Sequence, residues 1–100
     1  MNGQMAGKFP LGQIVATPGA LEALQESGET PWDFISRHVA GNWGDLDAED
    51  KLLNEQALKD GSRLFSAYHT TLGKKLYVIS EAVDDDGNRA ATTLLLPVEY

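Results

Sequence analysis

The segments Lys74–Val83, KKLYVISEAV, and Arg89–Pro97, RAATTLLLP, are separated by only five polar residues, DDDGN. The first is rich in β-branched and aromatic residues, and the second is also β-rich if its threonines are counted. Two such runs around an Asp-Gly pair are typical of a β-hairpin. The sequence therefore predicts strands over 75–83 and 90–96, joined by a turn centred on Asp86-Gly87.

Two further strands precede this hairpin. The segment Arg63–Thr70 is predicted to be a strand in which one face carries Leu64, Ser66 and Tyr68 and the other carries Arg63, Phe65, Ala67 and His69. Ile14 and Val15 predict a short strand within Gln13–Ala16. The sequence thus predicts an antiparallel sheet of three to four strands.

Three helices are predicted between the first strand and the second. Thr17-Pro18 and Thr30-Pro31 each place an N-cap residue before a proline in the first helical turn, and Asp47 is a suitable N-cap for the third helix. Glycines mark the predicted ends, at Gly28, Gly41 and Gly61. The order β-α-α-α-β-β-β predicts a single α+β domain over residues 9–100, with the helices packed on the sheet and a flexible tail over residues 1–8.

Apolar spacing predicts which helix faces are buried. In the second helix Trp32, Ile35 and Val39 recur at helical spacing and predict the stripe that faces the core, and Trp32 is therefore expected to be buried. In the third helix Leu53 and Ala57 predict a narrow buried stripe.

The composition excludes several classes of function. The net charge of −7, from 15 acidic and 8 basic residues, argues against broad binding to nucleic acid, which requires a basic surface. The absence of cysteine excludes disulfides, thiolate metal sites and a cysteine nucleophile. With no membrane-spanning segment and no secretory signal in the sequence, we expect a cytoplasmic location.

No motif in the chain predicts a metal or a cofactor. If Gly87 is aligned with the invariant glycine of a calcium loop, Ala82 and Thr93 occupy positions that require carboxylates. His38 and His69 are too few for a histidine metal centre unless carboxylates complete it. His38 near the end of the second helix suits the negative helix terminus, or alternatively a proton donor at the Gly41–Gly44 loop.

Acidic residues predict an interaction surface. They gather around the third helix and in the hairpin turn, and a basic protein is the partner that such a surface would attract. Trp43, between Asn42 and Gly44, is either a buried plug for its loop or an exposed anchor for a partner. The predicted partner-binding residues are Trp43, Asp45, Asp47, Glu49, Asp50, Glu55, Asp84, Asp85 and Asp86.

Two alternatives to this interaction protein remain. The first is a metal-free ribonuclease or toxin-like enzyme that uses His38, Arg63, Glu81 and Arg89, because helices followed by an antiparallel sheet resemble the architecture of barnase- and RelE-like proteins. The second is a module that dimerises through an edge strand at Ala90–Leu96.

Four stretches resemble a known family: FPLGQIVATPGALEAL, RHVAGNWGDLD, RLFSAYHT and the closing VISEA…RAATTLLLPVEY. They are similar to a family of short acidic bacterial proteins, carried on plasmids and integrative elements, that has no assigned activity. This chain departs from the family pattern at Asn42, where an aspartate is usual, and at the enlarged turn 83–88. The resemblance implies a mobile-element context, in which small acidic proteins often bind a nuclease or other defence protein.

Overall fold

The computed structural model describes residues 7–100 and contains three helices and a four-stranded sheet. The elements follow the order β-α-α-α-β-β-β, which confirms the α+β prediction. Along the chain they are β1 (Gln13–Ala16), α1 (Pro18–Ser27), α2 (Pro31–Val39), α3 (Ala48–Asp60), β2 (Leu64–His69), β3 (Lys75–Ser80), β4 (Ala91–Leu95) and a short 3-10 turn, η2 (Pro97–Glu99). Within residues 7–100 no helix has the length and apolar character needed to cross a membrane.

Most of the tail predicted over residues 1–8 lies outside the described residues. At its end, the Lys8 N–H donates a hydrogen bond to the Val39 carbonyl at 2.8 Å. This hydrogen bond fixes the chain to the end of α2 at Lys8.

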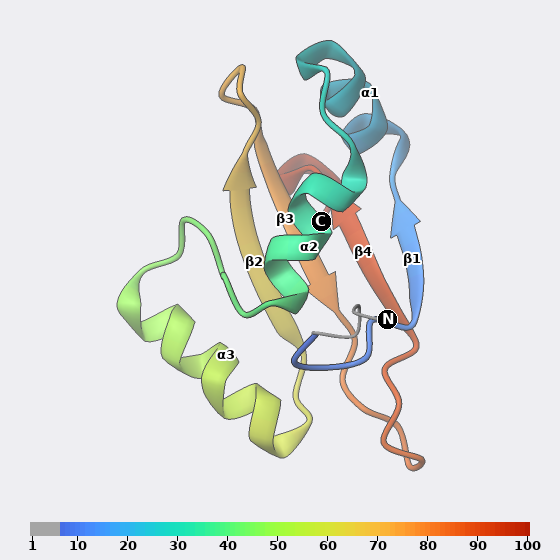
Figure 1. Cartoon of the computed structure of the whole chain (residues 1–100), viewed down its shortest axis with the longest axis vertical. Coiled ribbons are helices and arrows are strands. Elements are labelled where there is room, and N and C mark those ends of the chain that lie inside the picture. The colour runs from blue at the N-terminus through green and yellow to red at the C-terminus, as the bar shows by residue number, and fades with distance from the viewer. Residues whose placement is uncertain (1–6) are drawn as a thin grey trace.

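The predicted hairpin forms the middle of the sheet. Strands β3 and β4 pair antiparallel with Ser80 opposite Thr92, and β2 pairs antiparallel with the other side of β3. Strand β1 lies beside β4 and parallel to it, and the three helices, β2 and β3 all lie between these two strands in the sequence. The strand order is β1-β4-β3-β2, and the parallel β1–β4 pair makes the sheet mixed, whereas a sheet that is antiparallel throughout was predicted (Figure 1).

Strand β4 is an internal strand, and this corrects the prediction of dimerisation through Ala90–Leu96. Both of its sides already pair within the chain, one with β1 and the other with β3. Part of the outer side of β2 is also occupied, since Ala67 exchanges backbone hydrogen bonds with Trp43 and Asp45. The loop that follows α2 therefore covers this edge of the sheet.

Helices α1 and α2 cover one face of the sheet, and α3 lies alongside β2 (Figure 1). The main core joins Leu24 of α1 and Phe34 and Ile35 of α2 to Tyr68 and Val78 of the sheet, among others. Their burial supplies most of the hydrophobic stabilisation of this layer.

The buried face of α2 differs from the predicted stripe. It consists of Phe34, Ile35 and His38, whereas Trp32 is 55% exposed, so the prediction that Trp32 is buried was wrong. The residues Phe34 and His38 are four apart and point to the same side of the helix. Trp32 lies about 160° around the helix from Phe34, at 3.6 residues per turn, and faces away from the sheet.

The close approach of the loop to β2 depends on Gly44, and this can be tested. Its φ is 77°, and an added Cβ would lie 2.0 Å from the Ala67 carbonyl oxygen. We expect Gly44→Ala to lower the free energy of unfolding by about 3 kcal/mol or more, from left-handed backbone strain together with the clash. Urea unfolding measures the loss.

Gly73→Ala is the matched control for this substitution. Gly73 also has a positive φ, 86°, but an added Cβ would meet nothing within 4 Å. It should cost only the backbone strain, roughly 1–2 kcal/mol. Equal losses in the two variants would contradict the seating of the loop against β2.

Candidate functional site

The outer face of α3 exposes two leucines beside carboxylates. Leu52 and Leu53 are 58% and 57% exposed, and the carboxylates of Glu49 and Asp50 make no hydrogen bond or ion pair to any residue from 7 to 100. The buried positions of this helix are Asn54 and Ala57. The prediction that Leu53 belongs to the buried stripe was therefore wrong.

Asn54 explains this orientation of the helix. Its Nδ2 donates to the Phe65 carbonyl at 2.7 Å, and its Oδ1 accepts from the Phe65 N–H at 3.0 Å. The side-chain amide thus pairs with the edge of β2 as a neighbouring strand would. Because Asn54 faces β2, Leu52, two residues earlier, points to the opposite side of the helix, and Leu53, one residue earlier, lies at its flank, where it is still 57% exposed.

Trp43 is in the core, which corrects its assignment as an exposed partner anchor. It is only 4% exposed, and it packs with Ala57 of α3 and Leu64 of β2. Its Nε1 donates to the Glu55 carboxylate at 2.8 Å. Trp43 and Glu55 therefore attach α3 to the body of the protein, and Trp43 is the buried plug of the two alternatives.

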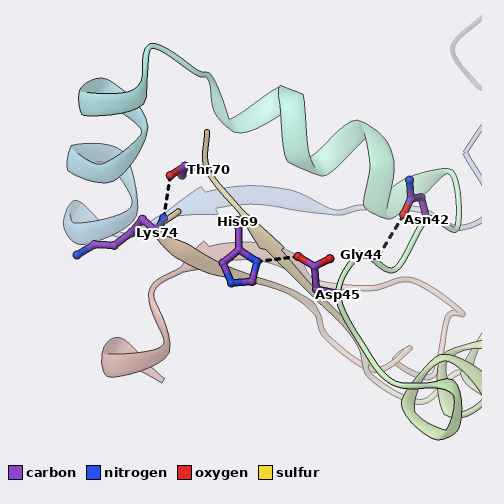
Figure 2. Close-up of polar contacts among 6 residues, drawn as sticks. All are labelled: Asn42, Gly44, Asp45, His69, Thr70 and Lys74. Carbon is purple, nitrogen blue, oxygen red and sulfur yellow. Dashed lines mark hydrogen bonds and ion pairs between the residues drawn. The ribbon is translucent and has the colours of Figure 1, made fainter. Parts of the chain in front are cut away.

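Other predicted partner-binding carboxylates have local structural roles. Asp45 contacts His69 at 2.7 Å, and the neighbouring Asn42 side chain accepts from the Gly44 N–H (Figure 2). Asp47 is the N-cap of α3 and accepts from the Asp50 N–H at 2.8 Å. These groups shape the loop and the start of the helix.

The acidic hairpin turn lies at the opposite end of α3. The Val83 N–H donates to the carbonyl of Gly61, which follows the last turn of the helix. Glu49, in the first turn, is therefore roughly 18 Å away along the helix axis, at 1.5 Å per residue. Asp84 accepts hydrogen bonds from the backbone of its own turn. The predicted acidic residues thus form two regions, one at each end of α3.

A pocket beside α3 was not anticipated from the sequence. Its volume is about 350 Å³, and we call it the aromatic pocket; its lining residues are Asp50, Leu53, Asn54, Arg63, Phe65, Tyr77 and Tyr100. The Phe65 and Tyr77 rings meet edge to face with centroids 4.7 Å apart, and the centroids of the Tyr77 and Tyr100 rings are 6.1 Å apart. The alternation of β2 and β3 already places Phe65 and Tyr77 opposite the helix-covered face, which is the signal that could have identified this pocket.

The four residues of the enzymatic alternative do not line one common cavity. Arg63 lines the aromatic pocket, whereas Arg89 lines a separate cavity beside Lys8 and Gly87. Arg89 is 3% exposed, and its guanidinium donates to backbone carbonyls, including that of Glu81. Arg89 therefore has a structural role, in which it ties the hairpin to the end of α3.

His38 is fully buried, so neither of its two predicted roles fits. A series of hydrogen bonds between hydroxyl groups and the ring determines which nitrogen of His38 carries the proton. Thr92 donates its one hydroxyl proton to the Leu11 carbonyl at 2.8 Å, so Ser80 must donate to Thr92 at 2.6 Å. Ser80 then accepts from Nε2 of His38 at 3.0 Å, and Nδ1 accepts from the Ser66 hydroxyl at 2.6 Å.

Burial acts against the charged form of this histidine. It lowers the pKa of His38 from its usual 6.5 to about 4, and the nearby Arg89 charge acts in the same direction. At neutral pH the ring is therefore uncharged and hydrogen-bonded on both nitrogens. It has no access to a substrate.

Within residues 7–100 no three histidine, aspartate or glutamate side chains gather in a group that could hold a metal ion. No family model matches the chain, and neither a curated protein sequence nor a solved structure is significantly similar to it.

The buried histidine predicts a pH dependence of stability. Between about pH 6.5 and 4 the unfolded chain binds a proton at His38 that the folded protein does not, so stability falls as the pH falls. We expect the free energy of unfolding to drop by about 2 kcal/mol between about pH 7 and 4.5 from this group. Urea unfolding at the two pH values measures the drop.

His38→Gln should remove this part of the pH dependence, and His69→Gln, at an exposed position, should keep it. Hydrogen bonds lower the pKa of the Glu29, Asp60 and Glu99 carboxylates, so these groups also lose stabilisation as the pH falls, but they do so equally in the two variants and cancel in the comparison. An unchanged slope in His38→Gln would show that another group is responsible.

Proposed function

We propose that this protein is a non-enzymatic interaction protein that presents the outer face of α3 to a basic protein. The observation that carries the proposal is the exposure of Leu52 and Leu53 directly beside the unpaired carboxylates of Glu49 and Asp50. Apolar contact surrounded by charge is the usual composition of a protein interface, in which the apolar centre supplies affinity and the charges supply orientation.

The net charge supports a basic partner. At −7 the chain repels nucleic acid and attracts positively charged protein surfaces, and this long-range attraction accelerates association. The resemblance to plasmid-borne acidic proteins supports a mobile-element context, in which the partner is a nucleic-acid-handling or defence protein of the host. Such proteins carry basic surfaces because their own substrates are anionic.

The enzymatic alternative lacks a supporting observation. Its proposed base, His38, is buried and engaged by two serines, and its two arginines line different cavities. General acid–base catalysis requires a group within hydrogen-bond reach of a bound substrate. We therefore advance no catalytic role for these residues.

Charge reversal tests the electrostatic part of the proposal. The double variant Glu49→Lys, Asp50→Lys should slow association with the basic partner protein about tenfold or more at low salt, because two lysines on α3 repel a basic surface that the two carboxylates attract. Glu22→Lys, Glu26→Lys on the exposed side of α1 changes the net charge equally and is the matched control. Capture from nuclease-treated lysate identifies the partner, and its association rate is then measured with purified protein at low and high salt.

Equal slowing in both double variants would reduce the effect to net charge and would contradict a specific role for α3. Association rates that do not depend on salt would contradict the electrostatic contribution altogether.

Site-specific crosslinking tests the apolar part. A photoreactive phenylalanine derivative at Leu53 should crosslink to the partner, because this side chain lies in the proposed interface. The same derivative at Leu21 of α1, which is 47% exposed, is the matched control and should give no crosslink. Crosslinking from Leu21 but not from Leu53, measured by mass spectrometry, would place the interface on another face.

A further inference from the structure

The aromatic pocket adjoins the proposed interface. Asp50, four residues before Asn54, and Leu53 line the pocket along the flank of α3, and both are exposed, so a partner that contacts the exposed surface of this helix also reaches the pocket. A volume of about 350 Å³ is near the lower end of the range of roughly 300–1,000 Å³ for ligand sites. The pocket is therefore large enough for one long side chain.

The walls of the pocket attract cations. Arg63 lies over the Tyr100 ring at 5.7 Å and Lys75 over the Tyr77 ring at 5.6 Å, so both tyrosines already have a positive group of this chain at one face. Aromatic faces are electron-rich, and arginine stacks on them more readily than lysine because its guanidinium is planar.

The two charges at the rim, Arg63 and Asp50, act in opposite directions on a cationic ligand. The Arg63 guanidinium donates to the Tyr100 hydroxyl at 2.7 Å. Asp50, by contrast, has no cation within ion-pair distance anywhere in the described part of the chain. A guanidinium from outside would therefore find an unpaired carboxylate beside aromatic rings, and it could donate to the carboxylate and stack on a ring at the same time.

We propose that the aromatic pocket binds an arginine side chain of the basic partner, with the Asp50 carboxylate as its counter-ion and the Tyr77 and Tyr100 rings as its walls. This inference rests on the proposed function, because it assigns a specific contact to the partner that docks on α3. It names the type of residue that the partner must supply.

The experiment uses a capped Gly-Arg-Gly peptide and the full chain, with no partner protein. The ring-proton signals of Tyr77 and Tyr100 are followed by NMR during the titration. We expect these signals to shift with the arginine peptide and to shift less with a capped Gly-Lys-Gly peptide at the same concentration. Tyr100→Leu, at a position that is 65% exposed, should abolish the shift of the Tyr77 signals.

Two substitutions at the rim should change the affinity in opposite directions. Asp50→Asn should weaken binding of the arginine peptide about two- to fivefold, the range of an exposed ion pair. Arg63→Gln should leave binding unchanged or strengthen it, because it removes a like charge from the pocket. The matched controls are Glu22→Gln and Lys74→Gln, which alter the same charges away from the pocket and should leave the affinity unchanged.

Several results would overturn the inference. One is the absence of any tyrosine shift, and another is equal binding of the lysine and arginine peptides. A third is tighter binding of adenosine 5′-monophosphate that Arg63→Gln weakens, since this would identify the pocket as a nucleotide site. Because the titration contains no partner, its failure leaves the capture and crosslinking results for α3 intact. If partner capture and crosslinking at Leu53 failed but the arginine peptide bound, the binding would be a property of the pocket that does not depend on the proposed partner.

Discussion

The two hydrogen bonds between the Asn54 amide and the backbone of Phe65 decide how α3 lies on the protein. They satisfy an edge of β2 that would otherwise present unpaired backbone groups, which is a common cause of unwanted strand pairing. They also orient a helix whose apolar residues are too few to orient it by burial alone. The exposed leucines, the unpaired carboxylates and the position of the aromatic pocket all depend on this pairing.

A second polar feature lies inside the sheet–helix layer. The hydroxyl groups of Ser66, Ser80 and Thr92 and the ring of His38 form a buried network. Each of these groups has a hydrogen-bond partner. A fully satisfied network of this kind specifies one arrangement of α2 over β2, β3 and β4, because any shift would leave a buried polar group unpaired. His38 therefore contributes to the specificity of the fold, although a histidine near a loop first suggests chemistry.

The parts of the fold that were predictable are those with local signals. The Asp-Gly hairpin and the capped helix starts at Thr17 and Asp47 depend on residues close together in the sequence, and the structure confirms them. The parallel pairing of β1 with β4 joins distant segments, and no local pattern indicates it. Apolar periodicity also failed at Trp32 and Leu53, because the buried faces of α2 and α3 each include a polar residue, His38 or Asn54, that such a pattern does not count.

The candidate site was predictable in the same uneven way. The exposed carboxylates of Glu49 and Asp50 follow from composition and helix position. The burial of Trp43 does not, because it depends on Ala57 and Leu64, which only the folded chain brings near. The aromatic pocket combines residues from α3, β2, β3 and Tyr100, and its formation requires the complete sheet.

The position of β1 beside β4 has a consequence for synthesis of the protein on the ribosome. Strand β1 is made before the three helices, but its hydrogen-bonding partner is the last strand of the sheet to be made. Helices α1 and α2 likewise have no sheet to cover until β2, β3 and β4 have followed them. Contacts between segments so far apart are costly to form early. The sheet, and the layer that α1 and α2 form over it, therefore cannot be completed until β4 has been translated, and the segments made earlier are open to chaperones until then.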